Sequence, residues 1–514
     1  MARDVRRRLR FRGEVVLETA LHIGAGAENG DVDLDVVRDG RGQPCVPGTS
    51  MAGLLRSLAE RLVDQDAVDQ DAVDQRTIGY VFGDREGAAR LNVDDAPIAD
   101  AVSEVRDGIG VDRRFGSAAD HFLFSRWVVS ANSTFPLSVT LDLGTDHRDD
   151  DAERLVRRVL GVLMEGDARL GGATSRGLGR VRLRDATEIA EDLNSFDGVL
   201  SALQRGTSPS GFVPFDPPAD ARLHRLHVTV TWCPDGPLFV RSGAEGVVVD
   251  GMPLVAAARD GNQLRLLLPG SSIKGALRSH AERIVRTMTG SAATGDLFQQ
   301  LDAPELAVVH RLFGRASGEA PNGAQSGRVA ALSIDDCLSS PIDASTWAAL
   351  TTPALAEGGD GTPQERHPRG GWSGDPDAAE LLRVAHHVAI DRWTGGAAEH
   401  FLYSQLEPHG LAWRPIELHL ELHLLDTDTL GLAATYLLLL VLRDLADGWV
   451  PLGSGTHRGH GAVAVQRIGF AVHGAGGWLG TEDGAELSLD ELVAQPERTE
   501  AARQAWIEVV SHDA

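Results

Sequence analysis

An internal repeat constrains this chain more than any other feature of its sequence. The segment 112–125 (DRRFGSAADHFLFS) recurs as 391–404 (DRWTGGAAEHFLYS), with nine identities in fourteen positions and no gap. Further pairs keep the same order along the chain: PGTSMAGLLR with PGSSIKGALR, VFG with LFG, VDD with IDD, and GGATSRGLG with GSGTHRGHG. Blocks that recur in one order indicate two homologous domains in a single chain.

The spacing of the matched blocks predicts the domain boundaries. The second copy is longer almost entirely upstream of its DRWTGG block, in a stretch rich in Gly, Pro and Asp that predicts a surface insertion. A similar stretch between the copies predicts a linker. We therefore expect a first domain at 1–204, a linker at 205–220, a second domain at 221–470 with its insertion at about 317–379, and an acidic tail at 471–514.

Each copy has the same predicted order of elements: a β-rich start, a helix, further strands, a second helix, a glycine-rich loop and a final strand. The repeated VDQDAVDQDAVDQ at 63–75 predicts a solvated acidic extension of the first helix. This order is the split βαβ arrangement, so we expect an α+β chain of two tandem ferredoxin-like (RRM-like) domains. The helices are expected at 50–62 and 152–164, and at 272–286 and 430–446.

The segment 415–424 (PIELHLELHL) alternates strictly, which predicts a strand with its leucines facing a core. His419, Glu421 and His423 would share the other face, where they could ligate a metal. The matching face of the first copy carries Ser, Thr and Asp instead. A solvated strand face is therefore the favoured interpretation.

Composition and charge limit the location and the partners. A net charge of -25 opposes nucleic-acid binding unless basic groups gather in a groove. Three widely spaced cysteines exclude a disulfide framework or a CxxC zinc site and indicate a reducing, cytoplasmic location. The Arg-rich N-terminus lacks a signal-peptide core, and the apolar run at 430–442 is too short to span a bilayer. No membrane partner is expected.

The PGSSIKGALR block contains the only lysine of the chain, Lys274. With Ser271 or Ser272 as the N-cap, this lysine lies in the first helical turn, where a phosphate on the free N–H groups would balance it. A plain helix cap with a lysine that snorkels to water fits equally well. The first copy has Ala52 in place of the lysine. The candidate phosphate-binding residues of the two blocks are Thr49, Ser50, Arg56, Ser271, Ser272, Lys274 and Arg278.

The glycine-rich loops follow a helix and precede a strand, the reverse of a Walker or dinucleotide loop. Glycines permit positive φ and close backbone approach, so N–H groups and an arginine can hold a phosphate chain. Tight turns also use glycine, but two matched copies favour phosphate binding. The candidates are Gly171, Gly172, Ser175, Arg176, Gly177 and Gly179, with Gly453, Gly455, His457, Arg458, Gly459 and Gly461.

Taken together, these blocks resemble the backbone subunits of type III CRISPR effector complexes, within the RAMP superfamily. The resemblance covers most of both halves and rests on 21–56, 237–256 and 266–278 with the two glycine-rich loops. It implies subunits that stack along a guide RNA (crRNA) with other effector subunits. Each subunit would cut complementary target RNA with a loop aspartate and Mg²⁺ or another divalent cation. Matching GDVDLDVVRD and VVVDGMPLVA onto that loop places Asp33 and Asp250 at the cleaving positions.

One carboxylate supplies few of the groups that RNA cleavage needs, but the 2′-OH of the RNA supplies the nucleophile and the guide duplex can supply the geometry. The aspartate need only orient that hydroxyl, take its proton or hold a metal ion. A loop aspartate is more often a turn or cap residue, and Asp31, Asp35 and Asp39 lie close to Asp33. A calcium loop is excluded, because DVDLD is not followed by the required Gly and Glu.

His121 and His400 match across the copies, inside the insertion that by resemblance forms a thumb-like hairpin between target nucleotides. The adjacent Phe122 and Phe401 could stack on bases or pack on their own domain.

The leading hypothesis is a fused double backbone subunit that binds guide RNA and cleaves target RNA at two sites. The first alternative is a scaffold that binds the guide without cleaving. The second is a guide-processing endoribonuclease of the same superfamily, which depends on a histidine near the first helix. Against it, neither PG(T/S)S block contains histidine, and His280 is matched by Leu58. A small-molecule metalloenzyme is disfavoured because its supposed ligands do not recur between the copies.

Overall fold

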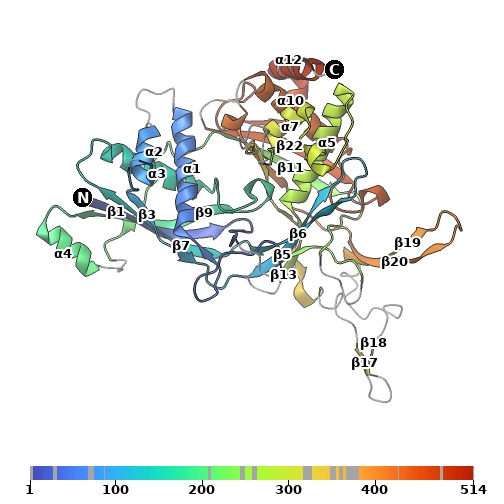
Figure 1. Cartoon of the computed structure of the whole chain (residues 1–514), viewed down its shortest axis with the longest axis horizontal. Helices are drawn as coiled ribbons and strands as arrows, with labels where there is room; N and C mark the ends of the chain where they lie inside the picture. Colours follow the sequence, from blue (N-terminus) through green and yellow to red (C-terminus); the bar gives the residue numbers. More distant parts are fainter. Residues whose placement is uncertain are drawn as a thin grey trace. The chain divides into compact units, whose positions relative to one another are not determined.

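A computed structural model gives the fold of the chain (Figure 1). The chain divides into two compact units. The first comprises Met1–Ser103, Arg126–Arg225 and His473–Gly477, and the second comprises Glu104–Ser125, Leu226–Val472 and Trp478–Ala514. The structure describes residues 4–26, 32–66, 75–85, 87–205, 210–243, 249–257, 263–316, 327–345, 347, 355–357, 363–365, 381–425, 428–474 and 478–512.

The first unit is built on an antiparallel sheet of order β9-β1-β7-β3. On β1, Leu9, Phe11 and Val15 alternate into the core, so Arg8 and Arg10 lie on the opposite face. The core lies between this sheet and the two long helices. The elements are β1 (Arg7–Leu17), α1 (Gly48–Asp66), β3 (Leu91–Val93), β7 (Thr134–Leu143), α3 (Asp149–Glu165) and β9 (Arg180–Asp192).

The second unit repeats this topology. Its sheet has the order β14-β21-β11-β22 and is extended by β23. If the four main strands of each repeat are numbered along the chain, both sheets have the order 2-3-1-4. The elements are β11 (Arg225–Pro234), α5 (Gly270–Thr289), β14 (Leu332–Ile334), β21 (Ile416–Glu421), α10 (Thr429–Ala446), β22 (Val463–His473) and β23 (Glu486–Ser488). The predicted α+β class, with two tandem ferredoxin-like domains, is confirmed.

Smaller elements complete the two units. They are β2 (Cys45–Val46), α2 (Gln75–Phe82), β4 (Ala96–Pro97), β8 (Ala168–Arg169), α4 (Phe196–Arg205), β10 (Val213–Pro214), β12 (Val255–Ala257), β13 (Gln263–Leu268), α6 (Leu297–Leu301), α7 (Ala307–Phe313), β15 (Cys337–Leu338), β16 (Ile342–Asp343), β17 (Leu355–Glu357), β18 (Pro363–Glu365), α11 (Leu489–Ala494) and α12 (Pro496–His512).

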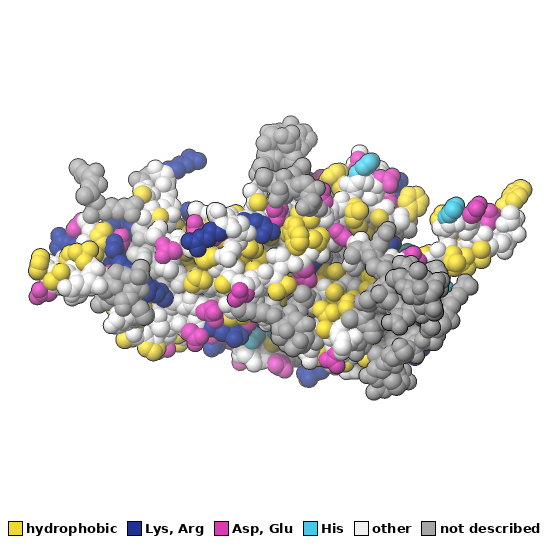
Figure 2. Space-filling view, turned by 90° about the horizontal axis from the view of Figure 1, so that it is seen from below, with side chains coloured by type: hydrophobic (Ala, Val, Ile, Leu, Met, Phe, Trp, Pro, Cys, Tyr) yellow, Lys and Arg dark blue, Asp and Glu magenta, His cyan; other side chains and the backbone are white. Residues whose placement is uncertain are grey.

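Each repeat carries a long β-hairpin, formed by β5 (Ser103–Val111) with β6 (Ala118–Val129) and by β19 (Leu382–Ile390) with β20 (Ala397–Pro408). Residues 104–125 of the first hairpin belong to the second unit. There, Phe122 packs edge-on against Phe298, and the Arg113 Nε donates to Glu282 at 2.6 Å. The second hairpin projects from its unit as an arm with hydrophobic side chains near its end (Figures 1 and 2).

Two segments predicted to be peripheral are packed into the units. In the expected linker (205–220), Phe215 is buried against Phe11, and β10 pairs with β9. The expected acidic tail (471–514) forms β23, α11 and α12, and it contributes the buried Trp478 and Trp506 to the core. Apolar residues spaced along these segments bury their side chains, which their overall polar composition concealed.

The expected strand at 415–424 needs correction, and the expected insertion at 317–379 lies partly outside the described residues. The segment 415–424 is a strand only to Glu421, and His419 is 4% exposed and pairs with Asp335 at 3.1 Å, so the predicted solvated face is wrong there. Within the expected insertion, β14 is an edge strand of the second unit's sheet and pairs with β21, whereas much of 346–380 lies outside the described residues, as do 67–74 of the acidic repeat.

Among the described residues, one helix, α10, is long and apolar enough to cross a bilayer by these two measures alone. More than half of it is buried, and it packs against α12, α7 and α5. This is the position of a core helix.

Candidate functional site

The two helix starts are capped by distant carboxylates. In the first repeat, the Gly48 N–H donates to Asp95 Oδ1 at 2.7 Å, and in the second the Gly270 N–H donates to Asp336 Oδ1 at 2.9 Å. These aspartates belong to the matched VDD and IDD blocks, so the recurrence of those blocks has a structural cause. A carboxylate already occupies the positive end of each helix, and a second anion would be repelled there.

The N-cap predicted at Ser271 or Ser272 is wrong, and phosphate binding at PGSSIKGALR stays a prediction that this geometry does not support. Lys274 is 6% exposed, and its Nζ donates to the carbonyl oxygen of Leu332 at 3.0 Å, so its charge points into the domain. The helix begins at Gly270 with Pro269 as its N-cap, not at Ser271 or Ser272. Thr49 and Ser50 occupy the same place at the start of α1.

The matched arginines of these helices also have structural partners. Arg56 donates through Nη1 to the Gly83 carbonyl at 3.1 Å, and Arg278 donates in the same way to the Gly314 carbonyl at 3.1 Å. Gly83 and Gly314 end the VFG and LFG blocks. Each arginine additionally pairs with a glutamate one helical turn away. These contacts tie each helix to the following turn and account for the repeated arginines without RNA.

The glycine-rich loops pack on the segment that follows the first strand of each repeat. The Gly172 N–H donates to the His22 carbonyl at 2.8 Å, and the equivalent Ser454 N–H donates to the Phe239 carbonyl at 2.6 Å. A side chain at Gly171 (φ +82°) would place its Cβ 2.2 Å from that His22 oxygen. The glycines thus serve close approach of the protein's own backbone.

The other loop candidates lie on a short 3₁₀ turn in each copy, at Thr174–Arg176 and Thr456–Arg458. Gly179 and Gly461 have φ near +80°, and a Cβ at either would lie 2.0 Å from the carbonyl oxygen of Leu170 or Leu452. The side chains of Arg176, His457 and Arg458 are exposed, and Ser175 is half-buried. The backbone positions of Gly177, Gly455 and Gly459 also have positive φ.

Asp33 lies beside the base of the first hairpin. Its neighbour Leu34 forms a parallel bridge with Arg126 of β6, and the Trp127 N–H donates to the Leu34 carbonyl at 2.9 Å. Asp33 itself is exposed. The hairpin therefore fixes the backbone of the aspartate loop and leaves the carboxylate at the surface.

Asp250 has the same setting in the second repeat. Its neighbour Gly251 forms a parallel bridge with Gln405 of β20, and the Leu406 N–H donates to the Gly251 carbonyl at 3.0 Å. Asp250 is exposed as well. The two aspartates thus occupy equivalent positions in one backbone register, as their sequence match predicts.

The neighbouring carboxylates of the first loop have other environments. Asp39 accepts hydrogen bonds from the N–H groups of Gln43 and Arg41, which lower its pKa and identify it as a turn residue. Asp35 is buried and accepts from the Val36 N–H at 2.7 Å. Asp31 lies outside the described residues.

The Asp250 carboxylate is held by the hairpin. Its Oδ2 accepts from the Ser404 N–H at 2.7 Å and from the Ser404 hydroxyl at 2.9 Å. These hydrogen bonds favour the ionised form and lower the pKa of Asp250. Ser404 ends the repeated 391–404 block, so that block serves to position this carboxylate.

Two arginines interact near the hairpin base of the first repeat. Burial, aided by the neighbouring Arg176 guanidinium, lowers the pKa of Arg126 to about 10. Arg126 comes from the hairpin base beside Asp33, and Arg176 comes from the glycine-rich loop. In the second repeat, Gln405 replaces Arg126, while Arg458 lies over the Tyr403 ring at 5.6 Å.

With this geometry in place, the comparison with known proteins is direct. The sequence matches the RAMP superfamily over residues 14–182 and 235–464, once for each repeat. The chain belongs to the RAMP superfamily. A curated relative from Methanocaldococcus jannaschii, "CRISPR system Cms endoribonuclease Csm3", is 25% identical over 210 residues, which cover 36% of this chain and 82% of the relative. The resemblance to a type III CRISPR RAMP subunit, with two copies in one chain, is confirmed.

The hairpin histidines of the two RAMP repeats share an unusual backbone. His121 has φ +64° and His400 has φ +65°, a region that residues other than glycine seldom adopt. Both side chains are exposed. Strain kept at one position in both repeats is typical of functional sites, so both residues remain candidates for contact with RNA.

The structure thus joins three predicted features of each RAMP repeat, namely the aspartate loop, the hairpin base and the glycine-rich loop. Sequence reasoning missed Asp95 and Asp336, although their blocks had been matched. It also missed Arg126 and Ser404, which stand at or just after the end of the repeated hairpin block.

Proposed function

We propose that this RAMP chain is a fused double backbone subunit of a type III CRISPR complex, which holds a guide RNA and cleaves complementary target RNA at two sites. The observation that carries the proposal is the matched placement of Asp33 and Asp250 beside the two hairpins. A relative named as an endoribonuclease supports the reaction class.

The carboxylates set limits on the chemistry. Because its pKa is lowered, Asp250 is ionised at neutral pH and is a weak base. Its better roles are to orient the 2′-OH of the target or to bind a cation. A hard oxygen donor at the surface fits Mg²⁺, which is held by one or two carboxylates together with water and phosphate. Such an ion would stabilise negative charge developing on the phosphate.

The glycine-rich loops would hold the guide backbone through Arg176 and Arg458. In the first repeat, the proximity of Arg126 and Arg176 gives a local positive field that favours phosphate in spite of the acidic chain. The loop glycines hold this turn against the segment after the first strand, so the arginines are presented from a fixed backbone.

The second hairpin would contact a further subunit of the complex. Trp393 is 96% exposed and Leu402 is 67% exposed, whereas Phe122 of the first hairpin packs on Phe298 in the second unit. Exposed apolar groups of this size on a projecting arm mark an interaction site.

The test is cleavage mapping in the reconstituted complex with its guide, end-labelled target RNA and Mg²⁺. Asp33→Ala should abolish one cut and Asp250→Ala the other, with losses of about 10²–10⁴-fold and with guide binding retained. Asp39→Ala is the matched control, because it removes an exposed carboxylate of the same loop and should leave both cuts intact. Cleavage at both positions in the Asp33→Ala, Asp250→Ala double variant would overturn the assignment.

A second candidate function is a guide-holding scaffold that does not cleave. The single candidate carboxylate of each site and the hydrogen bonds from Ser404 to Asp250 favour it. Full target binding without any cut in the wild-type complex would establish this function.

A further inference from the structure

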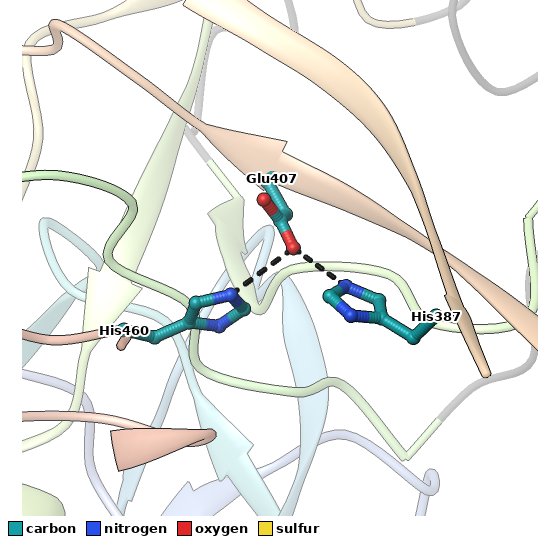
Figure 3. A group of neighbouring side chains, drawn as sticks. All are labelled: His387, Glu407 and His460. Carbon is teal, nitrogen blue, oxygen red and sulfur yellow. Dashed lines mark hydrogen bonds and ion pairs between the residues drawn. The ribbon is translucent and has the colours of Figure 1, made fainter. Parts of the chain in front are cut away.

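A buried cluster in the second unit joins the hairpin to the glycine-rich loop. His387 of β19 and His460 of the loop both direct Nε2 at one carboxylate oxygen of Glu407 on β20, at 2.8 Å and 3.2 Å (Figure 3). The Glu407 and His460 side chains are only 8% and 7% exposed. Among the described residues, these form the only group of three or more His, Cys, Asp or Glu side chains with metal-ligand spacing.

The first repeat shows that the fold does not require polar groups here. In the alignment of the matched blocks, Val128 is equivalent to Glu407 and Leu178 is equivalent to His460. Val128 and Leu178 form a small apolar cluster with Ala20. In the first repeat, apolar side chains fill the contact between the hairpin and the glycine-rich loop without the free-energy cost of desolvating charged groups. A buried carboxylate with two imidazoles at the equivalent place therefore calls for a specific partner.

We propose that His387, Glu407 and His460 bind a Zn²⁺ ion that fastens the second hairpin to the glycine-rich loop. Two imidazole nitrogens and one carboxylate oxygen are a recognised zinc donor set that leaves a fourth position for water. Zinc bonds of about 2.0–2.1 Å in a tetrahedron place donor atoms about 3.3 Å apart. The three donor atoms lie within 4.8 Å of one another, so small side-chain movements suffice.

Neighbouring groups complete the site without competing for the metal position. The Tyr403 ring stacks on His387 at 5.2 Å between ring centres. His409 Nε2 lies 3.8 Å from the second carboxylate oxygen of Glu407. Imidazole ligands favour Zn²⁺ over Mg²⁺, which distinguishes this site from the cation expected at Asp250.

The site is structural and separate from the proposed cleavage site. Asp250 is bound by Ser404, three residues before Glu407 on β20. Side chains three apart on a strand point to opposite faces, so a metal at Glu407 lies on the other side of the strand from the Asp250 carboxylate. The ion would hold the hairpin base in register and would take no part in cleavage.

The test is metal binding by the full-length chain without RNA. After dialysis against a weak chelator, the wild type should bind one equivalent of Zn²⁺, measured by elemental analysis. Free Zn²⁺ at about 100 times its Kd should raise the unfolding temperature by several degrees. The Co²⁺-loaded protein should show the strong visible absorption of a tetrahedral site.

The decisive variant is the double substitution Glu407→Val, His460→Leu, which installs the residues of the first repeat and so preserves a packing that this fold accepts. It should bind no zinc, and its unfolding temperature should not respond to the metal. His227→Gln is the matched control, because it removes a histidine paired with Glu417 at 2.6 Å elsewhere in the unit, and it should keep one equivalent. A wild type without zinc, or a double variant that retains it, would overturn the proposal. Neither readout depends on RNA cleavage.

Discussion

The two RAMP repeats place their aspartate loops in one register but build different surroundings for them. Both loops bridge the hairpin base through the residue after the aspartate, Leu34 or Gly251. Beside this shared bridge, the first repeat has arginines and an apolar junction, and the second has Gln405 in place of Arg126 and a His-Glu-His cluster. The comparison separates what both sites need from what each repeat adds to hold its hairpin.

The largest expected difference in stability is at the helix starts. Asp95→Ala should cost about 0.5–2 kcal/mol, because it removes only the cap on Gly48. Asp336→Ala should cost about 3 kcal/mol or more, because Asp336 also pairs with Arg106, whose side chain is 11% exposed. Hydrogen exchange in α1 and α5 would read the two losses separately. The exposed Asp94→Ala is the control, and equal losses in α1 and α5 would remove this difference between the repeats.

The next effect concerns Lys274, which has Ala52 as its counterpart. Lys274→Ala should cost about 1–3 kcal/mol of unfolding free energy, because it leaves the buried Leu332 carbonyl without its Nζ donor. The salt dependence of guide-RNA binding should stay unchanged. Arg176→Ala should reduce the slope of the logarithm of the binding constant against the logarithm of the salt concentration by about 1, as expected for a lost phosphate contact. A reduced slope for Lys274→Ala would restore the phosphate site predicted from the sequence.

The smallest effect is the pH dependence that Asp250 contributes in the second repeat. The lowered pKa of Asp250 in the folded state stabilises the fold above the usual aspartate pKa, and this contribution is lost as the pH falls through the lowered value. Ser404→Ala removes one donor, so the pKa of Asp250 should rise and the stability difference from wild type should vanish in acid. An NMR titration of the Asp250 carboxylate measures the shift, and an unchanged pKa would contradict it.

Much of the fold was predictable because the repeated blocks are local and ordered. Strand and helix order alone led to the ferredoxin-like sheets. The packing of 478–512 was missed because only a few large side chains, such as Trp478 and Trp506, enter the core from a polar segment. The burial of His419 was missed because alternation assigns a face to a side chain but does not show what covers that face.

The candidate site was predicted in part. The aspartate positions followed from the repeat match, and their shared register emerged from backbone bridges that no linear motif displays. The helix starts were misread because the groups that cap them lie far away in sequence, at Asp95 and Asp336. The His-Glu-His cluster was invisible for the same reason, since its members come from two hairpin strands and a loop, and only one repeat has them.

Because of the first hairpin, the boundaries of the sequence repeats differ from those of the compact units. In the sequence, the boundary between the two copies lies at 205–220, but residues 104–125 of the first copy belong to the second unit. There, Arg113 pairs with Glu282, which is 1% exposed. Dividing the gene between its two copies would remove Arg113 from Glu282, which Arg278 also contacts, and would remove Phe122 from the ring of Phe298. The second unit therefore depends on a segment that the sequence assigns to the first repeat, and a chain that exchanged one half would have to bring a compatible hairpin with it.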